Sequence, residues 1–176
     1  MNNCNFGNFE NKDSMNKVIL LTGGNIGDRK KVLGQARLAI ASTVGSILEQ
    51  SPIIESTAWG FESEDVFLNQ VLIIETSLSA IDILDTIQQI ELDLGRTRKD
   101  VQWTSRIIDI DILFFNSEII ESERLSIPHK HIQDRHFTLF GLNTLIPEFE
   151  HPVLHKTIAA LLQSCEDKSE VEVYNA

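Results

Sequence analysis

The sequence predicts an α+β fold with a ferredoxin-like βαββαβ core, a mainly antiparallel sheet, an added hairpin and further helices toward the C-terminal end. Two observations predict it. Short apolar runs alternate with segments in which apolar residues recur every three or four positions, so strand and helix signals interleave. Their order is strand, helix, strand, strand, helix, strand, which is the split βαβ arrangement. We expect the helices of this core on one face of the sheet.

Runs of apolar and β-branched residues predict the strands, and glycine-rich or polar segments predict the loops. The predicted strands are residues 18–22, 46–57, 67–76 and 107–115, with loops at 23–27 and 59–65. Pro52 interrupts the second strand, which favours an edge position or a bulge. The run 107–115 is expected to be a central strand, and Asn116 and Ser117 predict a hairpin turn into residues 118–121.

Helices are predicted where a capping residue precedes apolar residues at helical spacing. The predicted helices run from Asp28 to about 43, from Ser79 to 94, from 135 to 145 and from 156 to 164. Asp28 and Asp134 are the expected N-caps of the first and third helices. Ser79 with Asp82 resembles a capping box, and Gly95 suits the position that follows the end of the second helix.

One domain over residues 17–165 is expected, because neither a linker nor an internal repeat divides this part of the chain. Residues 1–16 are rich in Asn and lack apolar periodicity, which predicts a disordered extension. Residues 166–176 are acidic and are expected to form a frayed tail.

The net charge of −11 argues against general binding to nucleic acid or to an anionic membrane. No apolar run is long enough to span a bilayer, and no export signal is recognisable. Cys4 and Cys165 have neither a disulfide framework nor metal-binding spacing. We therefore expect a cytoplasmic protein without nucleic-acid or membrane partners. A monomer is expected, although no residue pattern determines the oligomeric state.

The strongest chemical signal is the pair of carboxylates in the run 107–115. If this run is a strand, Asp109 and Asp111 share one face, and the isoleucines between and beside them form the other. Adjacent carboxylates repel each other unless a cation lies between them, and their hard oxygens suit Mg²⁺ together with substrate phosphates. A solvated sheet edge is the alternative interpretation of the pair alone.

A basic cluster lies just upstream and holds four of the fifteen Lys and Arg residues: Arg96, Arg98, Lys99 and Arg106. A solvated surface is the alternative interpretation of this cluster alone. Metal-bound carboxylates beside cationic side chains are what the transfer of a phosphoryl-type group from a nucleotide requires. The glycines at 23–27 lack the spacing of a Walker A loop or a dinucleotide fingerprint, so phosphate binding would depend on side chains and metal.

Ordered motifs along most of the chain match one known family. They are residues 23–29, 67–69, 88–91, 95–98, 106–111, 128–129 and 135–137. On these motifs the sequence resembles the 6-hydroxymethyl-7,8-dihydropterin pyrophosphokinases of folate biosynthesis, from residue 18 to about 153. The resemblance implies that ATP donates its β,γ-diphosphate to the hydroxymethyl group of the dihydropterin and that AMP leaves.

The resemblance also implies roles for individual residues. Asp109 and Asp111 would hold two Mg²⁺ ions that bridge the triphosphate of ATP. Catalysis would depend on Arg96, Arg98, Arg106, Asp109 and Asp111. The nucleotide would be bound by Gln88, Glu91, Arg98, Trp103, Arg106, Ile112, His129 and Arg135. The pterin would be bound by Ser56, Thr57, Trp59, Phe67, Asn69, Trp103 and Phe137. Trp103 would lie on a mobile loop that covers the closed site.

The sequence departs from the usual family pattern at a few positions. Gly24 stands where Ser is common, Phe67 stands where Tyr is common, and Thr104 with Ser105 replaces a Gly-Pro pair. None of these positions is an expected metal ligand. Two other functions stay open on the residues alone: a different metal-dependent phosphoryl or nucleotidyl transferase, and a ligand-binding module without catalysis, because a fold does not determine a function.

Overall fold

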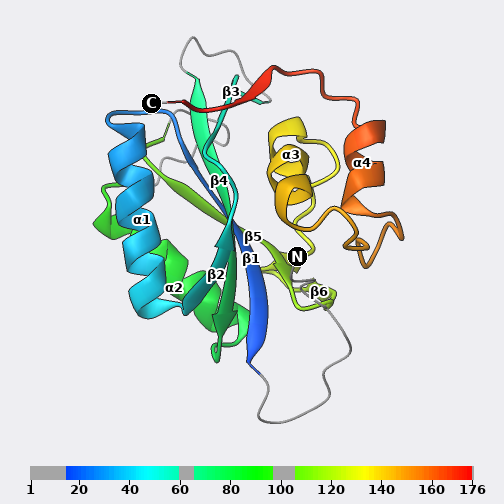
Figure 1. Cartoon of the computed structure of the whole chain (residues 1–176). Helices are drawn as coiled ribbons and strands as arrows, with labels where there is room; N and C mark the ends of the chain where they lie inside the picture. Colours follow the sequence, from blue (N-terminus) through cyan, green and yellow to red (C-terminus); the bar gives the residue numbers. More distant parts are fainter. Residues whose placement is uncertain (1–14, 60–65, 97–105, 176) are drawn as a thin grey trace.

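The computed structural model describes residues 15–59, 66–96 and 106–175 and shows three layers (Figure 1). A mixed arrangement of helices and antiparallel sheet is confirmed. Helices α1 (Arg29–Thr43) and α2 (Ala80–Asp93) cover one face of the central sheet. Helices α3 (His136–Leu145) and α4 (Ile158–Ser164) cover the other face. The expectation of helices on one face therefore holds for α1 and α2, and the C-terminal pair adds a third layer.

The central sheet pairs its strands antiparallel in the described residues. Its strands are β1 (Asn16–Gly24), β2 (Ser46–Gln50), β3 (Ile54–Ser56), β4 (Phe67–Thr76), β5 (Asp109–Phe115) and β8 (Val171–Val173). Their order is β5-β1-β4-β3-β8, and β2 also pairs with β4. The predicted interruption at Pro52 is confirmed, because it falls between β2 and β3. The predicted strand after Asn116 is β6 (Ile120–Glu121), but it pairs with β7 (Ser126–Ile127) and not with β5.

The central strands are apolar on both faces because both faces are covered. In β1, Val18 and Leu20 contact the core under α1 and α2, whereas Ile19 and Leu21 contact the core under α3 and α4. A strand buried on both sides needs a continuous apolar run and not an alternation. The same reason explains a wrong prediction: β5 reads as a central strand, yet it lies at one edge of the sheet.

The caps of the first two helices are confirmed. Asp28 accepts a hydrogen bond from the N–H of Lys31, and Ser79 accepts one from the N–H of Asp82. Gly95 follows α2 with a φ of +94°, the left-handed conformation that glycine adopts without strain. These caps were predictable because each depends on residues a few positions apart.

The cap predicted for α3 is wrong. Asp134 does not cap this helix, and the side chain at the observed N-cap, Arg135, makes no capping bond. The backbone N–H of His136 instead donates to Oδ2 of Asp167 at 2.9 Å, a residue of the C-terminal tail. The tail was expected to be frayed, but it forms β8 on the outer side of β3. None of the described helices combines the length and the hydrophobicity needed to cross a bilayer.

Candidate active site

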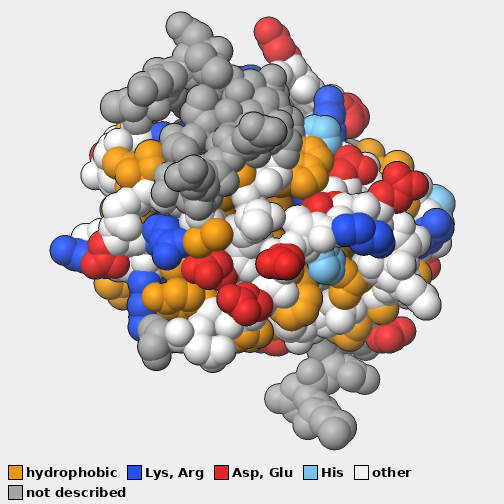
Figure 2. Space-filling view, turned by 90° about the horizontal axis from the view of Figure 1, so that it is seen from above, with side chains coloured by type: hydrophobic (Ala, Val, Ile, Leu, Met, Phe, Trp, Pro, Cys, Tyr) orange, Lys and Arg blue, Asp and Glu red, His pale blue; other side chains and the backbone are white. Residues whose placement is uncertain are grey.

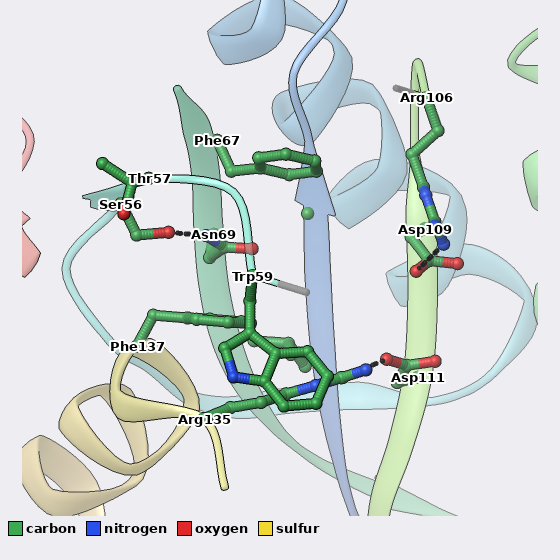
Figure 3. A pocket seen from close by; sticks show the side chains of 12 residues that line it. Ser56, Thr57, Trp59, Phe67, Asn69, Arg106, Asp109, Asp111, Arg135 and Phe137 are labelled. Atoms are coloured by element: carbon green, nitrogen blue, oxygen red, sulfur yellow. Dashed lines mark hydrogen bonds and ion pairs between the residues drawn. The ribbon is translucent and has the colours of Figure 1, made fainter. Parts of the chain in front are cut away.

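A pocket lies on the α3 face of the sheet, where β1, β3, β4 and β5 meet the start of α3 (Figure 3). Its lining residues are Leu21, Gly23, Ser56, Thr57, Trp59, Phe67, Asn69, Arg106, Asp109, Asp111, Arg135 and Phe137. On β5, Ile110 and Ile112 belong to the core under α1 and α2. Asp109 and Asp111 therefore project to the opposite face and into the pocket, as the alternation of a strand predicts.

The carboxylates of β5 form the charged end of the pocket. Oδ1 of Asp109 lies 2.6 Å from Nη1 of Arg96, and its Oδ2 lies 2.5 Å from Nη1 of Arg106. Oδ2 of Asp111 lies 3.3 Å from Nη1 of Arg135. Burial, followed by repulsion from Asp111, raises the pKa of Asp109 above its ordinary value. Two carboxylates side by side on one face of the strand favour cations as neighbours.

Glu91 connects α2 to this charged end. Its Oε1 accepts a hydrogen bond from the backbone N–H of Ile110 at 2.7 Å, on the edge of the sheet that no strand covers in the described residues. The same oxygen contacts Arg96, which in turn reaches Asp109. Burial raises the pKa of Glu91 to about 7, against the opposing effect of Arg96. Glu91 thus satisfies an edge donor of β5 and orients Arg96 toward the pocket.

His129 stands beside the charged end as a neutral side chain. Burial, together with the charges of Arg135 and His131, lowers the pKa of His129 to about 4. Its Nδ1 accepts a hydrogen bond from the backbone N–H of His131 at 3.2 Å, so its proton is on Nε2. That Nε2 lies 3.8 Å from Oδ2 of Asp111. His129 can therefore act there as a hydrogen-bond donor and not as a cation.

The other end of the pocket combines an amide with aromatic walls. Nδ2 of Asn69 donates to Oγ of Ser56 at 3.0 Å, and the rings of Phe67 and Phe137 flank this pair (Figure 3). Gly23 lies beside Asn69, and a Cβ at this glycine would overlap Oδ1 of the amide. This end suits a flat heterocycle that stacks on aromatic faces and forms hydrogen bonds at its edge.

The strand register joins the two ends. Gly23 of β1 is paired with Asn69 of β4 on one side and with Asp109 of β5 on the other. A single row across three strands thus holds the amide, the glycine and the first carboxylate. Arg135 closes the pocket from α3, with its guanidinium carbon 4.9 Å from the centre of the Trp59 ring.

The comparisons with known proteins agree on one family. Residues 19–147 match the family described as 7,8-dihydro-6-hydroxymethylpterin-pyrophosphokinase (HPPK). The chain belongs to this family.

Curated relatives carry the matching name. The 2-amino-4-hydroxy-6-hydroxymethyldihydropteridine pyrophosphokinase of Bacillus subtilis is 40% identical over 138 residues, which cover 77% of this chain and 82% of the relative. The protein of the same name from Aquifex aeolicus is 35% identical over 144 residues, covering 82% of this chain and 89% of the relative. The folic acid synthesis protein fol1 of Schizosaccharomyces pombe is 35% identical over 153 residues, covering 86% of this chain but only 21% of that larger protein.

The solved structures agree on the fold. The HPPK-DHPS of Plasmodium falciparum, solved with pteroate, superposes with a TM-score of 0.68 at 19% identity. The match covers 87% of this chain and 45% of the longer chain, so this chain spans less than half of that protein. The family resemblance drawn from the sequence motifs is confirmed.

The pocket brings together most of the residues that the sequence assigned to the HPPK site. The six expected pterin residues among the described positions all line it: Ser56, Thr57, Trp59, Phe67, Asn69 and Phe137. Arg106, Arg135 and both aspartates line it too. Arg98 and Trp103 lie outside the described residues.

Five expected residues lie outside the pocket lining. Three of them are connected to the lining through its aspartates: Arg96 contacts Asp109, Glu91 contacts Arg96, and His129 lies beside Asp111. Gln88 lies one turn before Glu91 on α2. The side chain of Ile112 is buried in the core under α1 and α2, so only its backbone is placed to contact a nucleotide.

Two residues that were not expected in the site, Leu21 and Gly23, also line the pocket. Gly23 was expected in a loop, but β1 continues through Gly24. A glycine at the end of an apolar strand run marks a close approach of another group, and here that group is the amide of Asn69. The glycine at the end of the run was visible in the sequence, but only the strand register shows that Asn69 is the residue that approaches it.

Proposed function

We propose that the chain transfers the β,γ-diphosphate of ATP to the hydroxymethyl group of 6-hydroxymethyl-7,8-dihydropterin and releases AMP. As a member of the HPPK family, it is a pyrophosphokinase of folate biosynthesis. The observation that carries the detailed proposal is the row of Asn69, Gly23 and Asp109 across three strands. This row sets an aromatic, amide-containing end directly beside a charged end within one pocket.

The aromatic end would bind the pterin. Phe67 and Phe137 offer ring faces, and offset stacking contributes about 0.5–1.5 kcal/mol beyond area burial. Oδ1 of Asn69 would accept a hydrogen bond from the edge of the ring, since the bond to Ser56 holds Nδ2 on the other side of the amide. These contacts would direct the hydroxymethyl group toward Asp109.

The charged end would bind the triphosphate. Arg96, Arg106 and Arg135 present planar guanidinium groups that can each contact two phosphate oxygens. In the reaction, the hydroxymethyl oxygen forms a bond to the β-phosphorus, the bond from that phosphorus to the oxygen of AMP breaks, and the proton of the hydroxyl is released to the solvent. Such a transfer depends on positioning and charge neutralisation, which these side chains supply.

The donor set fits Mg²⁺. Asp109 and Asp111 offer carboxylate oxygens on one face, and burial together with repulsion from Asp111 raises the pKa of Asp109 although Arg96 and Arg106 contact it. In the described residues no three His, Cys, Asp or Glu side chains form a metal-binding group. Mg²⁺ commonly takes one or two carboxylates and completes its shell with phosphates and water. Bound there as two ions, Mg²⁺ would neutralise the triphosphate.

We further propose that the core is ferredoxin-like, a classification that the strand order β5-β1-β4-β3 supports. The proposal includes a single domain from residue 17 that acts as a cytoplasmic monomer. Acidic and basic side chains are mixed on the face seen in Figure 2, and the net charge is −11, which supports the absence of nucleic-acid and anionic-membrane partners.

The test is product analysis after incubation with ATP, Mg²⁺ and 6-hydroxymethyl-7,8-dihydropterin. We expect AMP and a diphosphorylated pterin in equal amounts, and neither without the metal. Asp109→Asn and Asp111→Asn should each lower kcat by about a hundredfold or more. Asp85→Asn, which removes an exposed carboxylate of α2, is the matched control and should leave turnover unchanged.

Other products would overturn the proposal in recognisable ways. Formation of ADP would indicate an ordinary kinase, and release of pyrophosphate would indicate a nucleotidyl transferase. Binding of the pterin without any turnover, unchanged in both aspartate variants, would indicate a ligand-binding module.

A further inference from the structure

The C-terminal strap, residues 165–174, ties together two elements that line the pocket. It leaves α4, passes the start of α3 and pairs with β3 as β8 (Figure 1). Val171 is paired with Ser56, and the N–H of Tyr174 donates to the carbonyl of Ile53 at 2.9 Å. The strap thus contacts both β3, which carries Ser56, and α3, which carries Phe137.

Asp167 makes the contact with α3. Its Oδ2 accepts from the backbone N–H of His136 at 2.9 Å, and its Oδ1 accepts from the N–H of Ser169 at 2.9 Å. Nδ1 of His136 lies 3.0 Å from the carbonyl oxygen of Ser169. Burial acts to raise the pKa of Asp167, but the bonds from these two N–H groups outweigh it and hold the pKa below its ordinary value.

The position of His136 gives this contact its importance. His136 is the first residue of α3, and its two neighbours in the chain, Arg135 and Phe137, both line the pocket. The N-cap residue supplies no capping side chain of its own. The first turn of α3 therefore has its side-chain cap from the strap, and the cap lies between a residue of the charged end and a residue of the aromatic end.

We propose that Asp167 is a positioning residue of the active site: it caps α3 from the strap and thereby holds Arg135 against Asp111 and Phe137 against the pterin. This role rests on the proposed function of the pocket. A charged acceptor on a backbone N–H makes a stronger bond than a neutral one, and small displacements of reacting groups cost large factors in rate. Loss of the cap should therefore affect both ends of the pocket at once.

The test compares Asp167→Ala with Glu170→Ala, which removes a carboxylate from the same strap. Glu170 is exposed and makes no hydrogen bond or ion pair with the described residues. Asp167→Ala should raise KM for the pterin and lower kcat, so that kcat/KM falls about three- to thirtyfold, whereas Glu170→Ala should match the wild type. Asp167→Asn keeps one acceptor oxygen and should recover part of the loss. Hydrogen exchange at the His136 amide should be faster in Asp167→Ala and, to a smaller extent, in Asp167→Asn, but not in Glu170→Ala.

Assays run well below the melting temperature of every variant separate positioning from a structural role. A lower melting temperature with unchanged KM and kcat would overturn the proposal, as would unchanged exchange at the His136 amide. If Asp167→Ala does not fold, Asp167→Asn decides by the same criteria. A wild type that forms no AMP would overturn the proposed function. An active wild type with an equally active Asp167→Ala would instead overturn only the positioning role of Asp167.

Discussion

Ser56 holds the amide of Asn69 in one orientation: its Oγ accepts from Nδ2 at 3.0 Å, and both side chains are at most 4% exposed. The bond uses one of the two N–H groups of the amide and fixes its NH2 end on the side of Ser56. Oδ1 therefore lies next to Gly23, at the surface of the pocket, and is the atom that can meet a ligand.

Ser56→Ala should raise KM for the pterin about tenfold with little change in KM for ATP. The variant leaves a buried amide N–H without its partner, a loss of about 1–3 kcal/mol, and frees the amide to rotate. Steady-state kinetics with each substrate varied in turn measures this. Ser42→Ala, at an exposed position on α1, is the control. An unchanged pterin KM would show that the orientation of Asn69 is not important for binding.

Gly23→Ala should lower kcat/KM for the pterin about a hundredfold, because the added methyl group would displace the amide of Asn69. The control is Gly34→Ala on α1, where an added Cβ meets nothing within 4 Å. That variant should keep full activity and gain about 0.5–1 kcal/mol in the free energy of unfolding, since alanine favours the helix. Full activity of Gly23→Ala would contradict the assignment of the pocket.

Trp59→Leu should raise the Kd for ATP about three- to thirtyfold, which corresponds to the loss of a cation–π contact of about 0.5–2 kcal/mol with Arg135. Trp59→Phe keeps an aromatic face and should retain most of the affinity. Isothermal titration with ATP and Mg²⁺ would measure both variants. Equal affinities for Leu and Phe at this position would mean that the ring does not orient Arg135.

His151 should make stability depend on pH. Burial lowers the pKa of His151 below its ordinary 6.5, and its Nδ1 accepts bonds from the N–H groups of Val153 and Leu154. The unfolded chain therefore takes up a proton first as the pH falls. The stabilising effect is complete above pH 6.5 and is lost progressively below it, down to the pKa in the folded state.

Urea unfolding of the wild type and of His151→Asn between pH 5 and 8 measures this effect. Asparagine can accept at the Nδ1 position but does not titrate in this range, so the variant should lose less stability than the wild type on acidification. Glu91, with its pKa raised to about 7, acts in the opposite direction but equally in both proteins. Parallel curves for the two proteins would contradict the prediction.

Local patterns in the sequence were sufficient for several features of the site. The alternation in residues 109–112 predicted that both aspartates share a face, and the caps Asp28 and Ser79 were predictable from residues within one turn. The resemblance in motifs supplied the pterin residues, which the pocket brings together. Such features depend on backbone geometry over two to four residues, which the sequence displays directly.

The wrong predictions have a different cause. Asp134 has the chemistry of an N-cap, but it precedes the observed N-cap, Arg135, by one position. Asp167, which lies 31 positions beyond His136, supplies the cap of α3 instead. The apolar run of β5 indicates burial on both faces, which edge strands and central strands can share. β5 is an edge strand, and Glu91 accepts the hydrogen bond from the N–H of its Ile110. Contacts between residues distant in the chain produce no periodic pattern in the sequence.

The sequence by itself determined most of the helices and strands of this protein, the face on which Asp109 and Asp111 lie, and the family to which the chain belongs. Only the tertiary structure decided that Asn69, Gly23 and Asp109 stand in one row, because the strand register is set by the packing of whole strands. It also decided that the C-terminal strap caps α3. Both are consequences of which surfaces are buried together, a property of the folded chain as a whole and not of any short segment.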